Sequence, residues 1–208
     1  MTWIKICGIT NLKDALKATD LGVDALGFIL ALSPRRMDPL SIREITRALP
    51  KSLLKVGVFV NEELKEVLRV AEDCNLDALQ FHGEESPEYC RQVSLPVIKA
   101  IRVKDSESLQ EVEKYHFASI LLDSFSAAEQ AGGTGKTFCW EMAREVRKKR
   151  NFILSGGLNP SNVFRAIQML RPMGVDVCSG VERVPGKKDR FKMTEFVKEV
   201  RKADETAG

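Results

Sequence analysis

One cysteine stands where a thiol could act as a base. Cys7 ends a short apolar segment directly before Gly8, and Lys5 lies two residues earlier. Residues two apart in a strand share one face, so we expect the ammonium and the thiol on the same side. A nearby cation favours the thiolate, and a thiolate at a strand end is a competent general base. The alternative is an inert core cysteine, the usual state of a single thiol.

A carboxylate and two further polar residues occupy similar positions. Asp123 directly follows the apolar segment Ile120-Leu121-Leu122, which makes it a candidate general acid; the alternative is a cap within a long loop. Arg35 offers two parallel N–H donors for a carboxylate, although a solvated charge beside Arg36 is the simpler interpretation. His82 follows another apolar segment and is a candidate substrate contact.

Two glycine-containing loops could bind an anion. They read Ser155-Gly156-Gly157 and Ser179-Gly180. Glycine lets the backbone approach a ligand and direct its N–H groups at it, and a helix N-terminus behind such a loop favours negative charge. A glycine pair alone indicates no more than a turn. The two loops together predict a phosphate site, formed by Gly156, Gly157, Ser179 and Gly180.

The segment Gly135-Lys136-Thr137 resembles the end of a nucleotide-binding P-loop but fails its pattern. That motif requires a glycine five residues before Gly135, where this chain has Gln130. The preceding strand is expected to end at Leu122, thirteen residues before Gly135. This distance is too long for the tight strand–loop–helix turn of a P-loop, so ATP hydrolysis is not expected.

The candidate residues share one rim only if the elements before them lie side by side. Short apolar runs alternate with amphipathic runs along the whole chain. The expected strands are Trp3–Cys7, Ala25–Leu30, Leu54–Val60, Ala78–Phe81, Pro96–Ile101, Ala118–Leu122, Phe152–Leu154 and Val175–Cys178. The expected helices are Leu12–Leu21 with Asn11 as N-cap, Pro39–Leu49, a helix capped by Asn61 that runs to Asp73, one opened by Ser86-Pro87, Ser106–Lys114, Phe138–Lys149, one started by Asn159-Pro160, and Lys192–Ala203.

This alternation predicts the fold class. Strands that alternate with helices form a parallel sheet, and eight such units predict an α/β fold, a single (β/α)₈ TIM barrel over residues 1–208. In such barrels the active site lies at the carboxyl ends of the strands, and the last two loops commonly hold a phosphate. A doubly wound open sheet is the main alternative, and it is disfavoured because no G-x-G-x-x-G follows the first strand.

The composition narrows the class of protein. The chain has 208 residues, of which 44% are hydrophobic and 29% charged, with a net charge of +3. That weak, dispersed charge does not indicate a nucleic-acid partner, and no apolar run reaches the ~18 residues of a membrane span. The five cysteines lack C-x-x-C spacing, so neither a disulfide framework nor a zinc site is expected. The start of the chain lacks a signal-peptide pattern, which favours the cytoplasm.

A series of ordered motifs carries a family resemblance. It opens with Lys5-Ile6-Cys7-Gly8-Ile9-Thr10. The further motifs, in chain order, are Ala25-Leu26-Gly27-Phe28, Ser33-Pro34-Arg35, Val56-Gly57-Val58-Phe59-Val60-Asn61, Gln80-Phe81-His82-Gly83, Leu121-Leu122-Asp123, Gly132-Gly133-Thr134-Gly135, Ser155-Gly156-Gly157-Leu158-Asn159-Pro160 and Asp176-Val177-Cys178-Ser179-Gly180-Val181-Glu182. Each motif alone is weak, but their order along the whole chain is specific. The series resembles the phosphoribosylanthranilate isomerases.

The resemblance implies an Amadori rearrangement of N-(5′-phosphoribosyl)anthranilate to 1-(o-carboxyphenylamino)-1-deoxyribulose 5-phosphate. It makes Asp123 the general acid that protonates the furanose oxygen, and Cys7 the general base that takes the proton from C2′. It makes Arg35, or Arg36 one position later, the group that holds the anthranilate carboxylate. No metal or organic cofactor is implied. The partner is a small phosphorylated molecule, and the chain is expected to be a monomer or homodimer.

Two positions depart from the family pattern. The chain reads Phe138-Cys139-Trp140 where the family commonly has Phe-Asp-Trp, and Cys178 stands where serine is more usual. The first change affects an expected helix cap. The second affects an expected hydrogen bond beside Ser179 at the phosphate site.

Two other functions stay open. A related barrel enzyme such as indole-3-glycerol-phosphate synthase would need a lysine–glutamate catalytic set, and the histidine-pathway isomerase would need paired aspartates at the first and fifth strand ends. The chain has Cys7 at the first of these ends and continues to Arg102 at the other. A catalytically silent barrel that only binds phosphate compounds is disfavoured by the presence of both Cys7 and Asp123.

Overall fold

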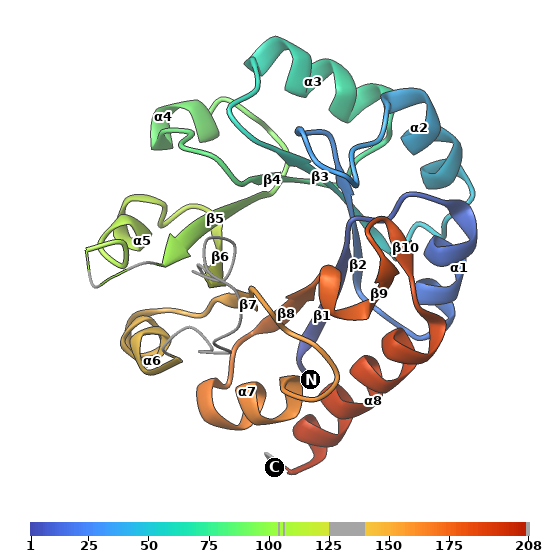
Figure 1. The fold of residues 1–208 in the computed structure, drawn as a ribbon. Helices are drawn as coiled ribbons and strands as arrows, with labels where there is room; N and C mark the ends of the chain where they lie inside the picture. Colours follow the sequence, from blue (N-terminus) through green and yellow to red (C-terminus); the bar gives the residue numbers. More distant parts are fainter. Residues whose placement is uncertain (104, 106, 125–139, 207–208) are drawn as a thin grey trace.

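The strand–helix alternation of the sequence closes into a barrel. The computed structural model of the protein describes residues 1–103, 105, 107–124 and 140–206. Strands β1 to β8 are parallel, pair in chain order and close through β1 and β8, which confirms the predicted TIM barrel (Figure 1). The strands are β1 (Trp3–Cys7), β2 (Ala25–Ile29), β3 (Leu54–Phe59), β4 (Ala78–Phe81), β5 (Val97–Val103), β6 (Ser119–Ser124), β7 (Ile153–Ser155) and β8 (Gly174–Val177).

Helices surround the barrel between consecutive strands (Figure 1). They are α1 (Leu12–Asp20), α2 (Pro39–Arg47), α3 (Leu64–Asp73), α4 (Pro87–Cys90), α5 (Glu111–Lys114), α6 (Trp140–Lys149), α7 (Val163–Leu170) and α8 (Arg190–Thr206). A 3₁₀ turn, η2 (Ser179–Val181), and a two-stranded hairpin, β9 (Glu182–Val184) with β10 (Lys187–Lys188), lie between β8 and α8. The sequence did not predict this hairpin, because two- and three-residue strands carry no periodic pattern.

Alternation within the strands divides the apolar side chains between two cores. The larger core lies between barrel and helices and includes Leu26 and Phe28 of β2, both fully buried. A separate cluster of strand side chains fills the barrel interior and consists of Ala25, Val56, Ala78, Ile98, Ala100, Leu121 and Ile153. Burial of a large apolar side chain contributes roughly 1.5–3 kcal/mol, so the strands are fixed from both faces.

Side-chain caps set several helix starts where the sequence places them. The Asn11 side chain accepts a hydrogen bond from the backbone N–H of Asp14 and caps α1, and Ser86 caps α4 in the same way. The prediction that Asn61 caps α3 is wrong. Glu63 is the N-cap residue there, while Asn61 has a left-handed φ of 52°. Its side chain instead accepts a hydrogen bond from the N–H of Glu84 in the next loop.

Several boundaries also differ from the prediction. Strand β5 continues to Val103 and β6 to Ser124, so Arg102 and Asp123 lie within strands rather than after them. Helix α7 starts at Val163, after a turn that begins at Asn159. The predicted start of α6 at 138 lies outside the described residues.

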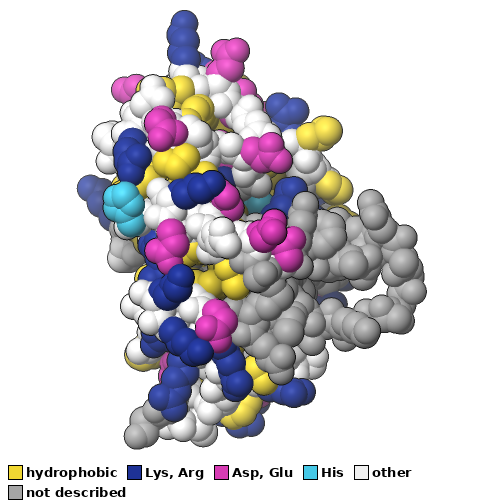
Figure 2. Space-filling model, turned by 90° about the vertical axis from the view of Figure 1, so that its left-hand side faces the viewer, with side chains coloured by type: hydrophobic (Ala, Val, Ile, Leu, Met, Phe, Trp, Pro, Cys, Tyr) yellow, Lys and Arg dark blue, Asp and Glu magenta, His cyan; other side chains and the backbone are white. Residues whose placement is uncertain are grey.

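Charged side chains are mixed on the outer surface. On the side formed by α4, α5 and α6, Lys and Arg side chains alternate with Asp and Glu (Figure 2). This agrees with the dispersed net charge of +3. Among the described residues, no helix combines the length and apolar character needed to cross a membrane.

Candidate active site

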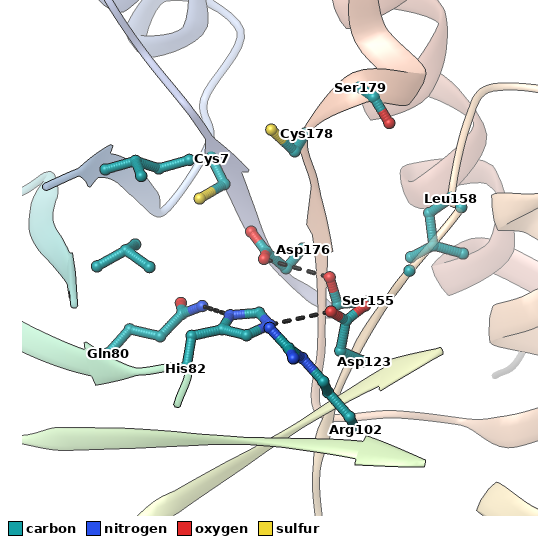
Figure 3. A pocket seen from close by; sticks show the side chains of 14 residues that line it. Cys7, Gln80, His82, Arg102, Asp123, Ser155, Leu158, Asp176, Cys178 and Ser179 are labelled. Carbon is teal, nitrogen blue, oxygen red and sulfur yellow. Dashed lines mark hydrogen bonds and ion pairs between the residues drawn. The ribbon is translucent and has the colours of Figure 1, made fainter. Parts of the chain in front are cut away.

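A pocket of about 500 Å³ opens at the carboxyl ends of the strands. The strands β1, β4, β5, β6, β7 and β8 and the loops that follow them supply its polar lining (Figure 3). These polar and glycine residues are Cys7, Gln80, His82, Arg102, Asp123, Ser155, Gly156, Gly157, Asp176, Cys178 and Ser179. The structure therefore brings together most of the residues selected from the sequence, namely Cys7, His82, Asp123, Gly156, Gly157 and Ser179.

The thiol of Cys7 lies in a buried electrostatic environment. The neighbouring Cys178 thiol and the charge of Lys5 outweigh burial and hold the pKa of Cys7 below its usual range. Lys5 is fully buried, and its Nζ donates to Asp176 Oδ1 at 2.8 Å. The prediction that Lys5 shares a face with Cys7 is confirmed. The site thus favours the thiolate, the form of cysteine that accepts a proton.

Asp123 is joined to a chain of hydrogen bonds across the pocket (Figure 3). Its Oδ2 lies 2.9 Å from His82 Nε2, and His82 Nδ1 lies 2.9 Å from Gln80 Nε2. If the Gln80 amide donates, then Nδ1 accepts and Nε2 carries the proton toward Asp123. Gln80 Oε1 is buried and lacks a hydrogen-bond partner within the described part of the chain. This row of hydrogen bonds fixes the carboxyl of Asp123 in the barrel opening.

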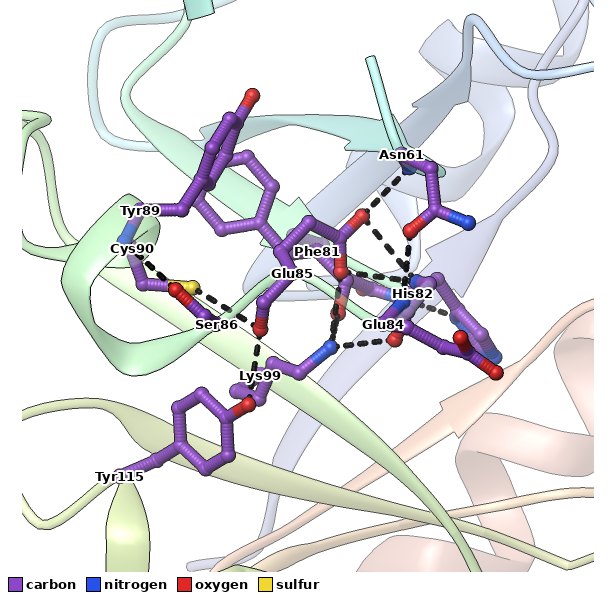
Figure 4. A network of polar contacts seen from close by, with 12 residues as sticks. Asn61, Phe81, His82, Glu84, Glu85, Ser86, Tyr89, Cys90, Lys99 and Tyr115 are labelled. Atoms are coloured by element: carbon purple, nitrogen blue, oxygen red, sulfur yellow. Dashed lines mark hydrogen bonds and ion pairs between the residues drawn. The ribbon is translucent and has the colours of Figure 1, made fainter. Parts of the chain in front are cut away.

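The turn after His82 rests on a buried ion pair (Figure 4). Lys99 Nζ donates to Glu85 Oε2 at 2.8 Å and to the carbonyl of Gly83 at 2.6 Å, and both charged side chains are 2% exposed. Glu85 also accepts from the backbone N–H groups of Gly83 and Asn61. A buried pair satisfied by this many hydrogen bonds holds a loop in one geometry. Neither Lys99 nor Glu85 was predicted from the sequence as a site residue.

The predicted phosphate loops differ in their contacts with the pocket. Gly156 and Gly157 have positive φ angles of 82° and 66°, which favour glycine, and both line the pocket with Ser179. Gly180 is not among the lining residues. A Cβ built on Gly180 would lie 1.8 Å from the carbonyl oxygen of Leu158, so its role is to let the loops after β7 and β8 pack closely.

Arg35 lies outside the pocket lining and is already paired. Its Nε donates to Glu182 Oε1 at 2.8 Å and its NH2 group to Oε2 at 2.6 Å. A Cβ on Gly8 would lie 2.8 Å from Arg35 Cδ, so the side chain crosses directly above the loop that follows Cys7. The structure thus places Arg35 at the rim of the pocket, beside the Cys7 thiol. It is held there by Glu182, for which the sequence predicted no role.

Two further pocket residues, which were not predicted from the sequence, are polar residues that interrupt apolar strands. Asp176 is a charged residue inside the apolar strand β8, and the strand register pairs it with Lys5. Gln80 is a polar residue inside the apolar strand β4 and is 1% exposed. A polar side chain inside an apolar barrel strand needs a hydrogen-bond partner, because burial of an unpaired polar group is costly.

A closed (β/α)₈ barrel with a thiol, a carboxyl and glycine loops at its carboxyl face defines the class of TIM-barrel proteins equipped for proton transfer on a small molecule. The sequence profile of the family described as N-(5′-phosphoribosyl)anthranilate (PRA) isomerase matches residues 4–199. The chain belongs to this family.

Individual relatives agree with the family match. The N-(5′-phosphoribosyl)anthranilate isomerase of Pelobacter propionicus is 47% identical over 199 residues, which cover 95% of each chain. The crystal structure of phosphoribosyl anthranilate isomerase from Thermotoga maritima has a TM-score of 0.91 and 44% identity, and covers 97% of this chain and 100% of its own. A second crystal structure of a phosphoribosyl anthranilate isomerase, in complex with reduced 1-(o-carboxyphenylamino)-1-deoxyribulose 5-phosphate, has a TM-score of 0.88 and 42% identity, with 97% and 100% covered.

Proposed function

We propose that the chain isomerises N-(5′-phosphoribosyl)anthranilate to 1-(o-carboxyphenylamino)-1-deoxyribulose 5-phosphate, a step of tryptophan biosynthesis. The observation that carries the proposal is the pairing of an activated thiol, Cys7, with an oriented carboxyl, Asp123, in one pocket. Family membership along the chain supports the choice of substrate. In this proposal residues 1–208 act as one catalytic domain in the cytoplasm, as a monomer or homodimer.

The acid step belongs to Asp123. Its protonated carboxyl gives a proton to the furanose ring oxygen, the C1′–O bond breaks, and the nitrogen lone pair forms a protonated imine. His82 Nε2 at 2.9 Å holds the carboxyl in the opening during this transfer. Orientation of the reacting groups lowers the barrier because it avoids the entropy cost of alignment.

The base step belongs to Cys7. Its thiolate takes the proton from C2′, and the electrons of the broken C–H bond move toward the imine nitrogen to give an enolamine. The enolamine tautomerises to the ketone of the product. Because the protonated imine itself accepts the electrons, we expect the reaction to need neither a metal nor an organic cofactor.

The remaining pocket residues hold the substrate in this proposal. The backbone N–H groups of Gly156 and Gly157 and the Ser179 loop bind the phosphate, in the position where such barrels commonly bind one. Arg35 holds the anthranilate carboxylate, which then competes with Glu182 for the guanidinium. Release from Glu182 leaves that carboxylate paired with Lys188, whose Nζ lies 3.0 Å away, so no buried charge is left alone.

The test is the fluorescence decay of freshly prepared phosphoribosylanthranilate with the purified protein. We expect Cys7→Ser and Asp123→Asn each to lower turnover by about 10²–10⁴-fold, the usual contribution of one general acid or base. Both variants should still bind the substrate and unfold at the native temperature. Cys90→Ser, at a buried thiol outside the pocket, serves as the control and should keep native turnover.

Two results would redirect the proposal. Near-native turnover by either variant would remove that residue from the mechanism. Binding of the substrate without any turnover by the native protein would favour a silent phosphate-binding barrel, and turnover of a different phosphorylated substrate would favour a related barrel enzyme.

A further inference from the structure

Two thiols lie at the carboxyl ends of the neighbouring strands β1 and β8, at the barrel opening. The register pairs Ile6 of β1 with Val177 of β8, and each thiol is the next residue in the chain: Cys7 ends β1, and Cys178 directly follows β8. Neighbouring strands lie about 4.7–4.9 Å apart, inside the Cα separation of about 4.4–6.8 Å that a disulfide spans. Each thiol shifts the pKa of the other, and Figure 3 shows both side chains at the same end of the pocket.

Two buried ammonium groups flank this thiol pair. Lys5 acts on Cys7, and Lys188 Nζ lies 3.9 Å from Cys178 Sγ and donates to the Cys178 carbonyl at 3.1 Å. Both lysine side chains are fully buried. Each lysine is also paired with a carboxylate, Asp176 or Glu182. Both ammonium charges nevertheless act to lower the pKa of Cys7.

The charge on the pair falls on Cys7. The interaction between the two thiols lowers the pKa of Cys7 and raises that of Cys178, so the site favours the thiolate at Cys7 and the protonated thiol at Cys178. The remaining described thiols differ, because burial raises the pKa of Cys74 and of Cys90 to about 11. Only the Cys7 and Cys178 thiols line the pocket among the described cysteines.

We propose that Cys7 and Cys178 are a site of reversible oxidative modification, at which a hydroperoxide converts the two thiols to a disulfide across β1 and β8. The disulfide forms independently of the substrate. Its consequence, the loss of turnover, rests on the proposed function of Cys7 as the base. A serine at position 178 would leave Cys7 without this partner.

The chemistry balances with one hydroperoxide. The Cys7 thiolate attacks a peroxide oxygen, the O–O bond breaks, and Cys7 becomes a sulfenic acid while water or an alcohol leaves. Cys178 sulfur then attacks the Cys7 sulfur, the S–O bond breaks, and a second water leaves with the proton of Cys178. Two electrons pass from the two sulfurs to the peroxide. A dithiol reductant returns both thiols by exchange.

The disulfide also protects the base from permanent damage. A sulfenic acid that finds no thiol is oxidised further to sulfinic acid, which reductants do not reverse. In the native chain the neighbouring Cys178 captures the sulfenic acid first. Cys178→Ser removes this capture and leaves the Cys7 thiol open to irreversible oxidation.

The test exposes the folded protein to hydrogen peroxide, blocks the remaining thiols, and maps tryptic peptides by mass. Trypsin places Cys7, Cys139 and Cys178 in three separate peptides, so the mass identifies which pair is linked. We expect a Cys7–Cys178 peptide in the native protein and in Cys139→Ser. A Cys7–Cys139 link, or oxidised Cys7 with no linked peptide, would overturn the proposal.

Turnover provides the second measurement, with each variant compared with its own unoxidised rate. After peroxide and then dithiothreitol, the native protein and Cys90→Ser should regain most of their turnover, while Cys178→Ser should regain several-fold less. Equal recovery in all three would exclude the protective role. If the linked peptide forms but the unoxidised protein does not turn over phosphoribosylanthranilate, the modification site stands and the proposed function fails.

Discussion

At the scale of single residues, the site depends on charges that the barrel buries beside the thiol. A lysine in a barrel interior is costly unless it is paired, and Lys5 is paired with Asp176 at 2.8 Å. The Lys5 ammonium lowers the pKa of Cys7 more than the charge of Asp176 raises it. Lys5 does not line the pocket, so its role is to position and stabilise the proposed base.

The pH dependence of turnover tests this role of Lys5. Because the pKa of Cys7 is lowered to about 6, from about 8.5 for a free thiol, kcat/KM should stay high at pH 7 and fall as the pH drops below 6. In Lys5→Gln the amide still donates to Asp176 but carries no charge. The acid limb should then move to higher pH, with kcat/KM recovering in alkaline buffer.

A second variant distinguishes the loss of the Lys5 charge from a general loss of protein stability. Lys55→Gln breaks another barrel ion pair, with Asp77 at 2.7 Å, at a site outside the pocket lining. It should change the free energy of unfolding without moving the acid limb. An acid limb at the native pH in folded Lys5→Gln would show that Lys5 does not tune Cys7.

The sequence predicted the reactive residues better than their partners. Cys7, Asp123 and the glycines stand at strand ends, where fold and residue type together indicate chemistry. Arg35 was predicted to hold the anthranilate carboxylate, yet its guanidinium is bound to Glu182, 147 positions away in the chain. No local pattern indicates a contact between residues so distant in sequence, because it depends on how β9 folds back over the first loops.

At the scale of elements, the strands were predicted within a few residues and the loops were not. Strands in a helix-covered barrel are continuous apolar runs, which are easy to recognise. The hairpin of β9 and β10 has no such run, and it is held by buried polar contacts such as Lys188 with Glu182 at 3.0 Å. Asn61 has the residue type of a helix cap, but the left-handed φ of 52° directs it to another loop.

Close packing of the loops after β7 and β8 gives a prediction at this scale. In Gly180→Ala the new Cβ would lie 1.8 Å from the Leu158 carbonyl oxygen, so the two loops must separate. If they bind the phosphate, KM should rise by about tenfold or more, equivalent to at least about 1.4 kcal/mol of lost binding. Steady-state kinetics and phosphate inhibition would measure the change.

A second glycine supplies the control for this variant. Gly22 has a positive φ of 71° and open space around it, and it lies between α1 and β2, on the face opposite the pocket. Gly22→Ala should cost about 1 kcal/mol of stability through backbone strain and leave KM unchanged. A native KM in folded Gly180→Ala would remove the phosphate from these loops.

At the scale of the whole molecule, barrel closure joins the two ends of the chain. The alternation of strands and helices predicts eight units but does not indicate how the last helix is fastened to the first strand. The structure shows that α8 lies beside the N-terminus (Figure 1). Asp204 of α8 accepts hydrogen bonds from the N–H of Thr2 at 2.9 Å and from its hydroxyl at 2.6 Å.

Closure by Asp204 gives a stability that depends on pH. Burial raises the pKa of Asp204, but the hydrogen bonds from Thr2 and Arg201 outweigh it, so the folded-state pKa lies below the unfolded value. The stabilisation is therefore complete above the unfolded pKa of about 3.9 and is lost as the pH falls through the folded pKa. Asp204→Asn should lower the free energy of unfolding at pH 7 by about 1.5–3 kcal/mol, the range for hydrogen bonds to a charged group.

Urea unfolding of native and variant protein, at pH 7 and at decreasing pH, measures this difference. The gap between the two should narrow in acid, because protonation removes from the native protein the charge that the variant already lacks. Glu195→Gln is the control, since Glu195 is 53% exposed and lies 3.7 Å from Lys198; such surface pairs contribute about 1 kcal/mol or less. A gap of equal size for both variants would mean that the ends of the chain are fastened by packing of α8 alone.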